Sequence, residues 1–241
     1  MRLIPALILG LPMIAQTICP VQERANAFLK LVNANYQALT AVQQEASWAA
    51  STDVKPEHDA AAEAAGKAYA AFNGNPMLIS EARELLPHRE ELTPLSVREL
   101  ERVLLNAAEG PMTNPKLTAD RIAAETAQAS TMNGFTWKLD GKPISANRID
   151  EILAKSHDLK ERQRVWEVSK ENGPALKEGL LKLRDLRNGC ARELGYPDYF
   201  ALQVARYGLT TDQMVEQNRQ FLKELMPLYK QLHTWVKYEM A

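Results

Sequence analysis

Histidine, cysteine and carboxylate side chains are the groups in this 241-residue chain that could bind a metal or transfer protons. The four histidines are His58, His88, His157 and His233, and no two of them lie four residues apart. A zinc helix of the HExxH type needs that spacing, because residues i and i+4 share one helix face. The sequence therefore predicts no catalytic and no metal-ligating residue, and its substrate-binding residues stay undefined.

The histidines lie in surroundings that are typical of helix surfaces. His88 is followed by Glu90 and Glu91, and such a charge cluster indicates a solvated face. His58 lies beside carboxylates in a predicted first helical turn, where we again expect a surface position. His233 lies in an amphipathic pattern, so we expect it to pack or to form a hydrogen bond rather than to bind a metal.

Motifs for nucleophilic or phosphate chemistry are also lacking. The chain has no Gly-rich phosphate loop and no G-x-S-x-G elbow. Cys190 lies in a helical pattern without a neighbour that would activate its thiolate, so we expect a small buried side chain. A basic cluster around it is interspersed with Asp185 and Glu193, which predicts a salt-linked helix surface of little energetic weight. The cluster consists of Lys182, Arg184, Arg187 and Arg192.

The elements that would position these side chains are nearly all helices. Apolar residues recur at steps of three and four, glycine is scarce, and alanine is plentiful. Thr93 and Asp158 are placed as caps, Pro56 fits a first turn, and Gly110 and Gly173 are each followed by a proline that favours a helix end. We expect helices over residues 25–51, 55–72, 93–109, 117–133, 158–172, 175–194 and 210–241.

One short stretch has a different pattern. The sequence FTWKLDGKPI alternates Phe135, Trp137 and Leu139 with polar residues and then reaches Asp140 and Gly141. Asp-Gly is among the strongest signals for a two-residue hairpin turn. The predicted fold class is therefore all-α with one small β-hairpin near residues 135–144.

The final predicted helix has an amphipathic pattern. Thr210 and Gln213 have the spacing of a capping box, and Pro227 predicts a kink. Its apolar positions are Met214, Phe221, Leu225, Leu228, Leu232 and Val236. Because helices are stabilised mainly by packing, a face this apolar predicts a partner surface.

The first 19 residues have the pattern of a secretory signal peptide. Arg2 precedes an apolar stretch over residues 3–15, which is shorter than the roughly 20 residues that a membrane-spanning helix needs. Pro5 and Pro12 disfavour the alternative of a buried N-terminal helix. We expect a secreted or periplasmic protein. Cys19 follows Gln-Thr-Ile rather than a small residue, which argues against a lipid anchor. The net charge of −1 gives no sign of nucleic-acid binding.

Three stretches, taken in order, resemble the N-terminal part of bacterial members of the angiotensin-converting enzyme family. The first is EASWAASTDVKPEHDAAAEAAGKAYAAF, and the last is LMPLYKQLHTWVKYEMA. The second half of the chain carries the most specific one, VWEVSKENGPALKEGLLKLRDLRNGCARELGYPDYF. Helical periodicity alone would not dictate that order of residues, and the resemblance covers nearly all of the chain after residue 19.

The resemblance implies a large, nearly all-helical zincin-type peptidase with a deep cleft. Members of the family are zinc peptidyl-dipeptidases that release dipeptides from the C-termini of peptides. Two histidines of an HExxH helix and a later glutamate hold the zinc, and the HExxH glutamate activates the zinc-bound water. Members also commonly bind chloride.

The chain departs from this pattern at the metal site. In the family the HExxH helix follows the segment that resembles QLHTWVKYEMA, so no catalytic or zinc-binding residue carries over to this sequence. We expect residues 20–241 to be the lid and cleft-wall portion, truncated before the zinc motif, inactive alone and binding no zinc. Its partners would be a missing C-terminal catalytic half and peptide substrates. Two alternatives remain: a non-catalytic secreted helical binding or scaffolding protein, and a fragment completed by a separately encoded C-terminal half.

Overall fold

The computed structural model describes residues 20–240, and the predicted signal segment 1–19 with Cys19 lies outside the described residues. Helices dominate, and the strands form one antiparallel hairpin, which confirms the predicted fold class. The helices are α1 (Pro20–Thr52), α2 (Pro56–Asn73), α3 (Pro76–Leu85), the 3-10 helix η1 (Leu86–Glu91), α4 (Pro94–Ala107), α5 (Pro115–Asn133), α6 (Ala146–Lys155), α7 (Leu159–Val168), α8 (Asn172–Glu193), α9 (Tyr199–Ala205) and α10 (Thr211–Glu239). The strands are β1 (Trp137–Leu139) and β2 (Lys142–Ile144).

Short polar side chains begin most of the helices. The hydroxyl of Thr93 accepts a hydrogen bond from the backbone N–H of Ser96 at the start of α4. Thr210 and Gln213 form the predicted capping box of α10, since each side chain accepts from the backbone N–H of the other residue. Each contact satisfies a donor that the first helical turn leaves free. These local signals explain why the predicted starts of α4 and α10 are confirmed.

The hairpin turns at the predicted dipeptide. Asp140 and Gly141 both have positive φ, at 51° and 77°. Positive φ at both central residues matches the right-handed twist of the flanking strands, so a two-residue turn closes the hairpin. Trp137 pairs with Ile144 in the ladder.

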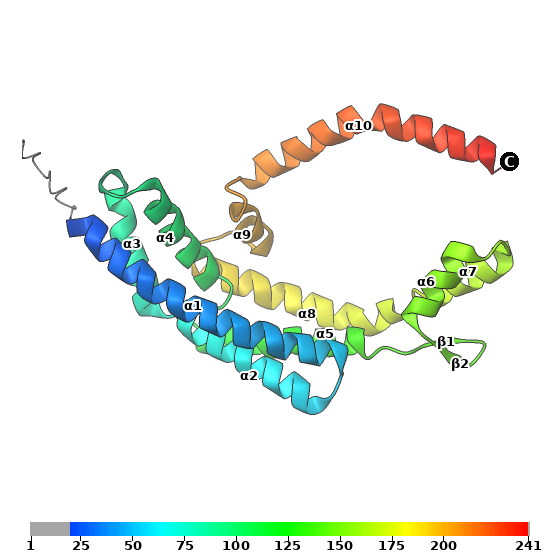
Figure 1. Cartoon of the computed structure of the whole chain (residues 1–241), viewed down its shortest axis with the longest axis horizontal. Coiled ribbons are helices and arrows are strands. Elements are labelled where there is room, and N and C mark those ends of the chain that lie inside the picture. Colours follow the sequence, from blue (N-terminus) through cyan, green and yellow to red (C-terminus); the bar gives the residue numbers. More distant parts are fainter. Residues whose placement is uncertain (1–19, 241) are drawn as a thin grey trace, which may run out of the picture.

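Four of the longer helices, α1, α2, α5 and α8, run together along one axis of the molecule (Figure 1). α1 packs against α2, and α5 packs against both α2 and α8. One apolar core joins α1, α3 and α4 through buried residues such as Leu29, Leu85 and Leu100. A second core joins α4, α8 and α9 through Leu105, Ala191 and Leu202. The hairpin, α6 and α7 form a separate lobe, shown in green at one end of Figure 1.

One predicted helix boundary is wrong. The sequence predicts a helix end at Gly173 and Pro174, but the preceding helix α7 already ends at Val168 and α8 begins at Asn172. Proline lacks a backbone N–H, yet the first turn of a helix leaves those donors free. Pro174 is therefore compatible with the start of α8, and it does not mark the end of the helix before it.

The last helix leaves the packed body. α10 contacts α9 and then extends away from the other helices, and Figure 1 shows it bending along its length. The helix continues through Pro227, and no residue of α10 is buried. The predicted apolar face is present, but beyond the contact with α9 the described residues leave most of it exposed.

Candidate functional site

The histidines are scattered over the described part of the chain. His58 Nδ1 lies 2.7 Å from the carbonyl oxygen of Asp53, and His233 Nε2 lies 2.7 Å from the hydroxyl of Tyr229. His88 pairs with Glu91 on the surface, and His157 is exposed. Within residues 20–240, no three histidine, cysteine, aspartate or glutamate side chains come together in a group able to hold a metal ion.

Cys190 is a buried thiol, as its sequence context predicts. Burial raises its pKa, because the charged thiolate is disfavoured away from water. A thiol of this kind is neither a good nucleophile nor a good metal ligand at neutral pH. Cys190 therefore serves the packing of α8.

The basic cluster on α8 is only partly the predicted salt-linked surface. Arg184 pairs with its neighbour Asp185 in solvent, as expected. Arg187 differs, because its side chain is largely shielded and pairs with Glu125 of α5. The periodicity of one helix could not reveal that contact, because it depends on how α5 and α8 pack.

A polar cavity of about 330 Å³ lies among the described helices. Its walls come from α1, α2, α5, α9 and the end of α4. Tyr36 and Tyr69 contribute phenol groups, Glu109 and Glu125 carboxylates, and Arg121 a guanidinium. Polar groups at this density inside a helical bundle can bind water or a polar ligand, whereas an apolar ligand would leave them unpaired.

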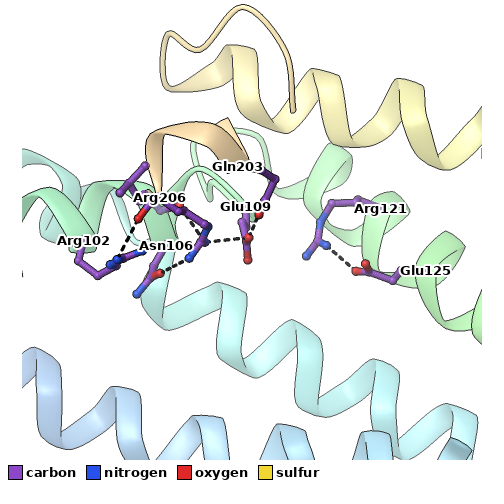
Figure 2. Close-up of polar contacts among 8 residues, drawn as sticks. Arg102, Asn106, Glu109, Arg121, Glu125, Gln203 and Arg206 are labelled. Carbon is purple, nitrogen blue, oxygen red and sulfur yellow. Dashed lines mark hydrogen bonds and ion pairs between the residues drawn. The ribbon is translucent and has the colours of Figure 1, made fainter. Parts of the chain in front are cut away.

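One side of the cavity is a network between α9 and the end of α4 (Figure 2). Arg206 Nη2 lies 2.8 Å from Glu109 Oε1, and Gln203 Nε2 donates to the same oxygen at 3.1 Å. Arg206 also donates to the side-chain oxygen of Asn106 at 3.4 Å, and Arg102 donates to the Arg206 carbonyl at 3.3 Å. These contacts fasten α9 to a segment about 100 residues earlier in the chain.

The facing side of the cavity is built on α5. Arg121 Nη1 donates to Glu125 Oε2 at 2.6 Å, one helical turn along, as Figure 2 shows. Glu125 accepts a second contact through its other oxygen from Arg187 of α8. Arg187 also lies over the ring of Tyr199, with Cζ 5.2 Å from the ring centroid. The Glu125 carboxylate thus accepts hydrogen bonds from two guanidinium groups.

Tyrosines complete the wall of the cavity. The rings of Tyr36 and Tyr69 lie with centroids 5.9 Å apart. Burial raises the pKa of Tyr69, and its hydrogen-bonding contact with Tyr36 raises that pKa further. Burial also raises the pKa of Tyr199. The phenols of Tyr69 and Tyr199 therefore stay neutral and can donate hydrogen bonds throughout the physiological pH range.

A second candidate surface is the exposed apolar face of α10. Leu225, Leu228 and Trp235 are 60%, 65% and 59% exposed. Phe221, Leu222, Leu225, Met226 and Tyr229 line an open apolar groove on this helix. Contiguous apolar surface of this kind is typical of an interaction site.

Sequence reasoning missed the cavity, because its residues come from five separate segments. The only local signal was the four-residue spacing of Arg121 and Glu125, which is common on helix surfaces. Nothing in the sequence near Arg206 or Glu109 indicates that the two side chains meet.

Between residues 20 and 240, none of the helices combines the length and the apolar character that crossing a membrane requires.

A comparison with family models identifies the family of the chain. A peptidase family model described as angiotensin-converting enzyme matches residues 20–241, which is nearly the whole sequence and includes every helix and strand described above. The chain therefore belongs to the angiotensin-converting enzyme family, a family of metallopeptidases.

Proposed function

We propose that residues 20–241 form the lid and cleft-wall portion of a zinc peptidase that releases C-terminal dipeptides from peptides, and that this chain alone is inactive. The observation that carries the proposal is the family match over residues 20–241 in a sequence that contains no HExxH motif. The catalytic zinc would then be held by a separate catalytic half, and residues 1–19 would direct secretion.

The side chains of residues 20–240 do not fit a catalytic zinc. Such a site takes three protein ligands, most often histidine or carboxylate, that converge on one point. The histidines here instead lie apart from one another: His58 contacts the Asp53 carbonyl, and His233 contacts the Tyr229 hydroxyl.

The exposed face of α10 supports a catalytic half as partner. An amphipathic helix gains most of its stability by burying its apolar face, and α10 buries none of its residues within the described chain. A complementary helical surface that covers Leu225, Leu228 and Leu232 would supply that burial. Lys223, Lys230 and Lys237 follow one another at seven-residue steps, which places them together on the opposite side of the helix.

Metal analysis and a peptide-cleavage assay test the inactivity of the chain. We expect the purified chain to hold less than stoichiometric zinc and to release no dipeptide from a short peptide with a free C-terminus. One tightly bound zinc per chain together with peptide hydrolysis would contradict the proposal.

A mixing experiment tests the partner. The chain is combined with a polypeptide that carries the HExxH half of a family member, and association and zinc-dependent dipeptide release are measured. We expect Leu228→Lys to weaken association, whereas Lys230→Ala on the opposite side should not. Lack of association at micromolar concentration would remove the proposed partner.

The alternative of a non-catalytic secreted binding or scaffolding protein makes a different prediction. It requires the isolated chain to be soluble and to melt cooperatively without exposing apolar surface to a dye such as ANS. Strong dye binding by the parent chain, reduced in Leu228→Lys, would instead indicate that the apolar face of α10 is an uncovered interface.

A further inference from the structure

We infer that α10 docks into an apolar groove between two helices of the catalytic half, which cover two separate rows of apolar side chains on α10. This inference rests on the proposed function, which identifies the catalytic half as the partner, and it adds the shape and chemistry of the surface that the partner presents. One partner helix, as in a two-stranded coiled coil, would leave one of the rows in water.

The two rows follow from a repeat in the sequence of α10. Pairs of adjacent apolar residues recur at steps of seven: Met214 and Val215, Phe221 and Leu222, Leu228 and Tyr229, and Trp235 and Val236. Seven residues make nearly two helical turns, so the first members of the pairs form one row along the helix and the second members form another. Adjacent residues are about 100° apart around a helix axis, so the two rows point in different directions.

The surface between the rows is apolar as well. Leu225 follows Phe221 by four residues and Leu222 by three, which places it beside both rows, and Leu232 repeats this arrangement one heptad later. A coiled-coil seam uses two of every seven positions, whereas a helix that faces the core of a bundle uses three. With both rows and the residues between them, α10 has the wider pattern.

Both rows are free in the described chain. No residue of α10 is buried, and Leu222 and Tyr229 of the second row are about as exposed as Phe221 and Leu228 of the first. The open apolar groove on α10 lies on the side of the second row, because its lining includes Leu222, Met226 and Tyr229 but not Leu228 or Leu232. The second row is therefore an interaction surface in its own right, and not only the edge of the first.

The bend of α10 suits a helix that lies in a groove. Pro227 follows Leu225 by two residues and therefore lies on the opposite side of the helix, as do Lys223 and Lys230. A proline ring clashes with the preceding turn, so the helix bends away from the side that carries it. Curved helices have their convex side towards solvent and wrap around the core that they cover. The bend seen in Figure 1 is thus compatible with both rows facing a partner.

Substitutions in each row test the two-helix groove. Association of the full chain with a polypeptide that carries the HExxH half is measured for the parent, Leu222→Lys and Leu228→Lys. We expect both variants to weaken association by roughly tenfold or more, because each would place a charge in an apolar contact. Lys223→Ala on the polar side is the matched control. Both leucines are exposed in the chain alone, so neither variant should change its melting temperature.

The outcomes separate this inference from the proposed function. Weakening by Leu228→Lys with unchanged affinity in Leu222→Lys would overturn the two-helix groove and leave the catalytic half as the partner. Lack of association in the parent chain would remove both.

Photo-cross-linking measures the geometry directly. p-Benzoylphenylalanine replaces Leu222 in one variant and Leu228 in another, and the cross-links to the HExxH half are mapped by mass spectrometry. We expect the two positions to cross-link to two different helices of that half. Cross-links from both positions to one helix would contradict the inference.

A second copy of the chain is the competing occupant of α10. Sedimentation velocity of the mixture should show a complex with one copy of each polypeptide. A homodimer of the chain that persists in the presence of the HExxH half, and that Leu222→Lys and Leu228→Lys both disrupt, would assign the two rows to a second copy and overturn the inference.

Discussion

Arg206, which caps the C-terminal end of α9, lies 2.8 Å from Glu109, which follows α4, so that a single ion pair joins segments 97 residues apart. Both side chains are more than two-thirds shielded from solvent. Shielding makes the pair less sensitive to salt than a surface pair, and its loss is costly because the remaining partner stays partly shielded from water.

Removing the carboxylate should therefore destabilise the attachment of α9. We expect Glu109→Gln to lower the free energy of unfolding by about 1–2 kcal/mol, measured by urea denaturation. Glu216→Gln is the matched control, because its pair with Arg219 is exposed and should contribute nothing measurable. Equal losses from the two variants would show that the Arg206–Glu109 pair has no special role.

Because the apolar face of α10 is exposed, a polar substitution on it should not lower the free energy of unfolding. Leu225→Lys should leave the free energy of unfolding within about 0.5 kcal/mol of the parent, because Leu225 buries little surface in this chain. The same change should reduce ANS fluorescence. Leu202→Ala in the core is the contrast, with an expected loss of about 2–5 kcal/mol. A large loss from Leu225→Lys would mean that this face is covered within the chain.

A close backbone approach disfavours any side chain at Gly74. A Cβ atom at this position would lie 1.9 Å from the carbonyl oxygen of Gly110, which is far inside van der Waals contact. Gly74→Ala should therefore destabilise the chain by about 1–3 kcal/mol, as measured by thermal or urea melts. Gly173→Ala is the control, because a Cβ atom added there would meet no atom within 4 Å. Alanine also favours the helix, so the stability of this variant should stay equal or rise by up to about 1 kcal/mol.

Three partly buried tyrosines predict a loss of stability in alkali. Burial raises the pKa of Tyr69, Tyr196 and Tyr199, so the folded chain keeps protons that the unfolded chain releases. The stabilisation is complete below the ordinary tyrosine pKa of about 10 and declines as pH rises above it. Urea midpoints between pH 8 and 11, with absorbance at 295 nm, measure the effect. Tyr69→Phe should flatten the decline, and an unchanged slope would exclude Tyr69 as a contributor.

Sequence patterns predict the features that depend on neighbours in the chain. The helix cap is formed by Thr210 and Gln213, and the hairpin turn by Asp140 and Gly141. In each case the interacting residues are at most three positions apart, so the local sequence is enough to predict the feature. Pro174 is ambiguous in sequence, because proline both ends helices and fits their first turn. The predicted surface position of Arg187 is wrong because its partner Glu125 is 62 residues away and lies on another helix. The polar cavity could not be predicted either, because its residues also come from separate helices.

The lobe formed by the hairpin, α6 and α7 has a core of its own. Ile149, Ile152 and Val165 are buried there against Trp137 and Ile144, and every member of this cluster falls between residues 137 and 165. Because all members of this cluster are close in sequence, the lobe can unfold and refold locally without disturbing the core shared by α1, α3 and α4. Amide hydrogens in this lobe should therefore exchange together, with a free energy of local unfolding that differs from that of the other helices. The chain would then unfold in more than one cooperative unit.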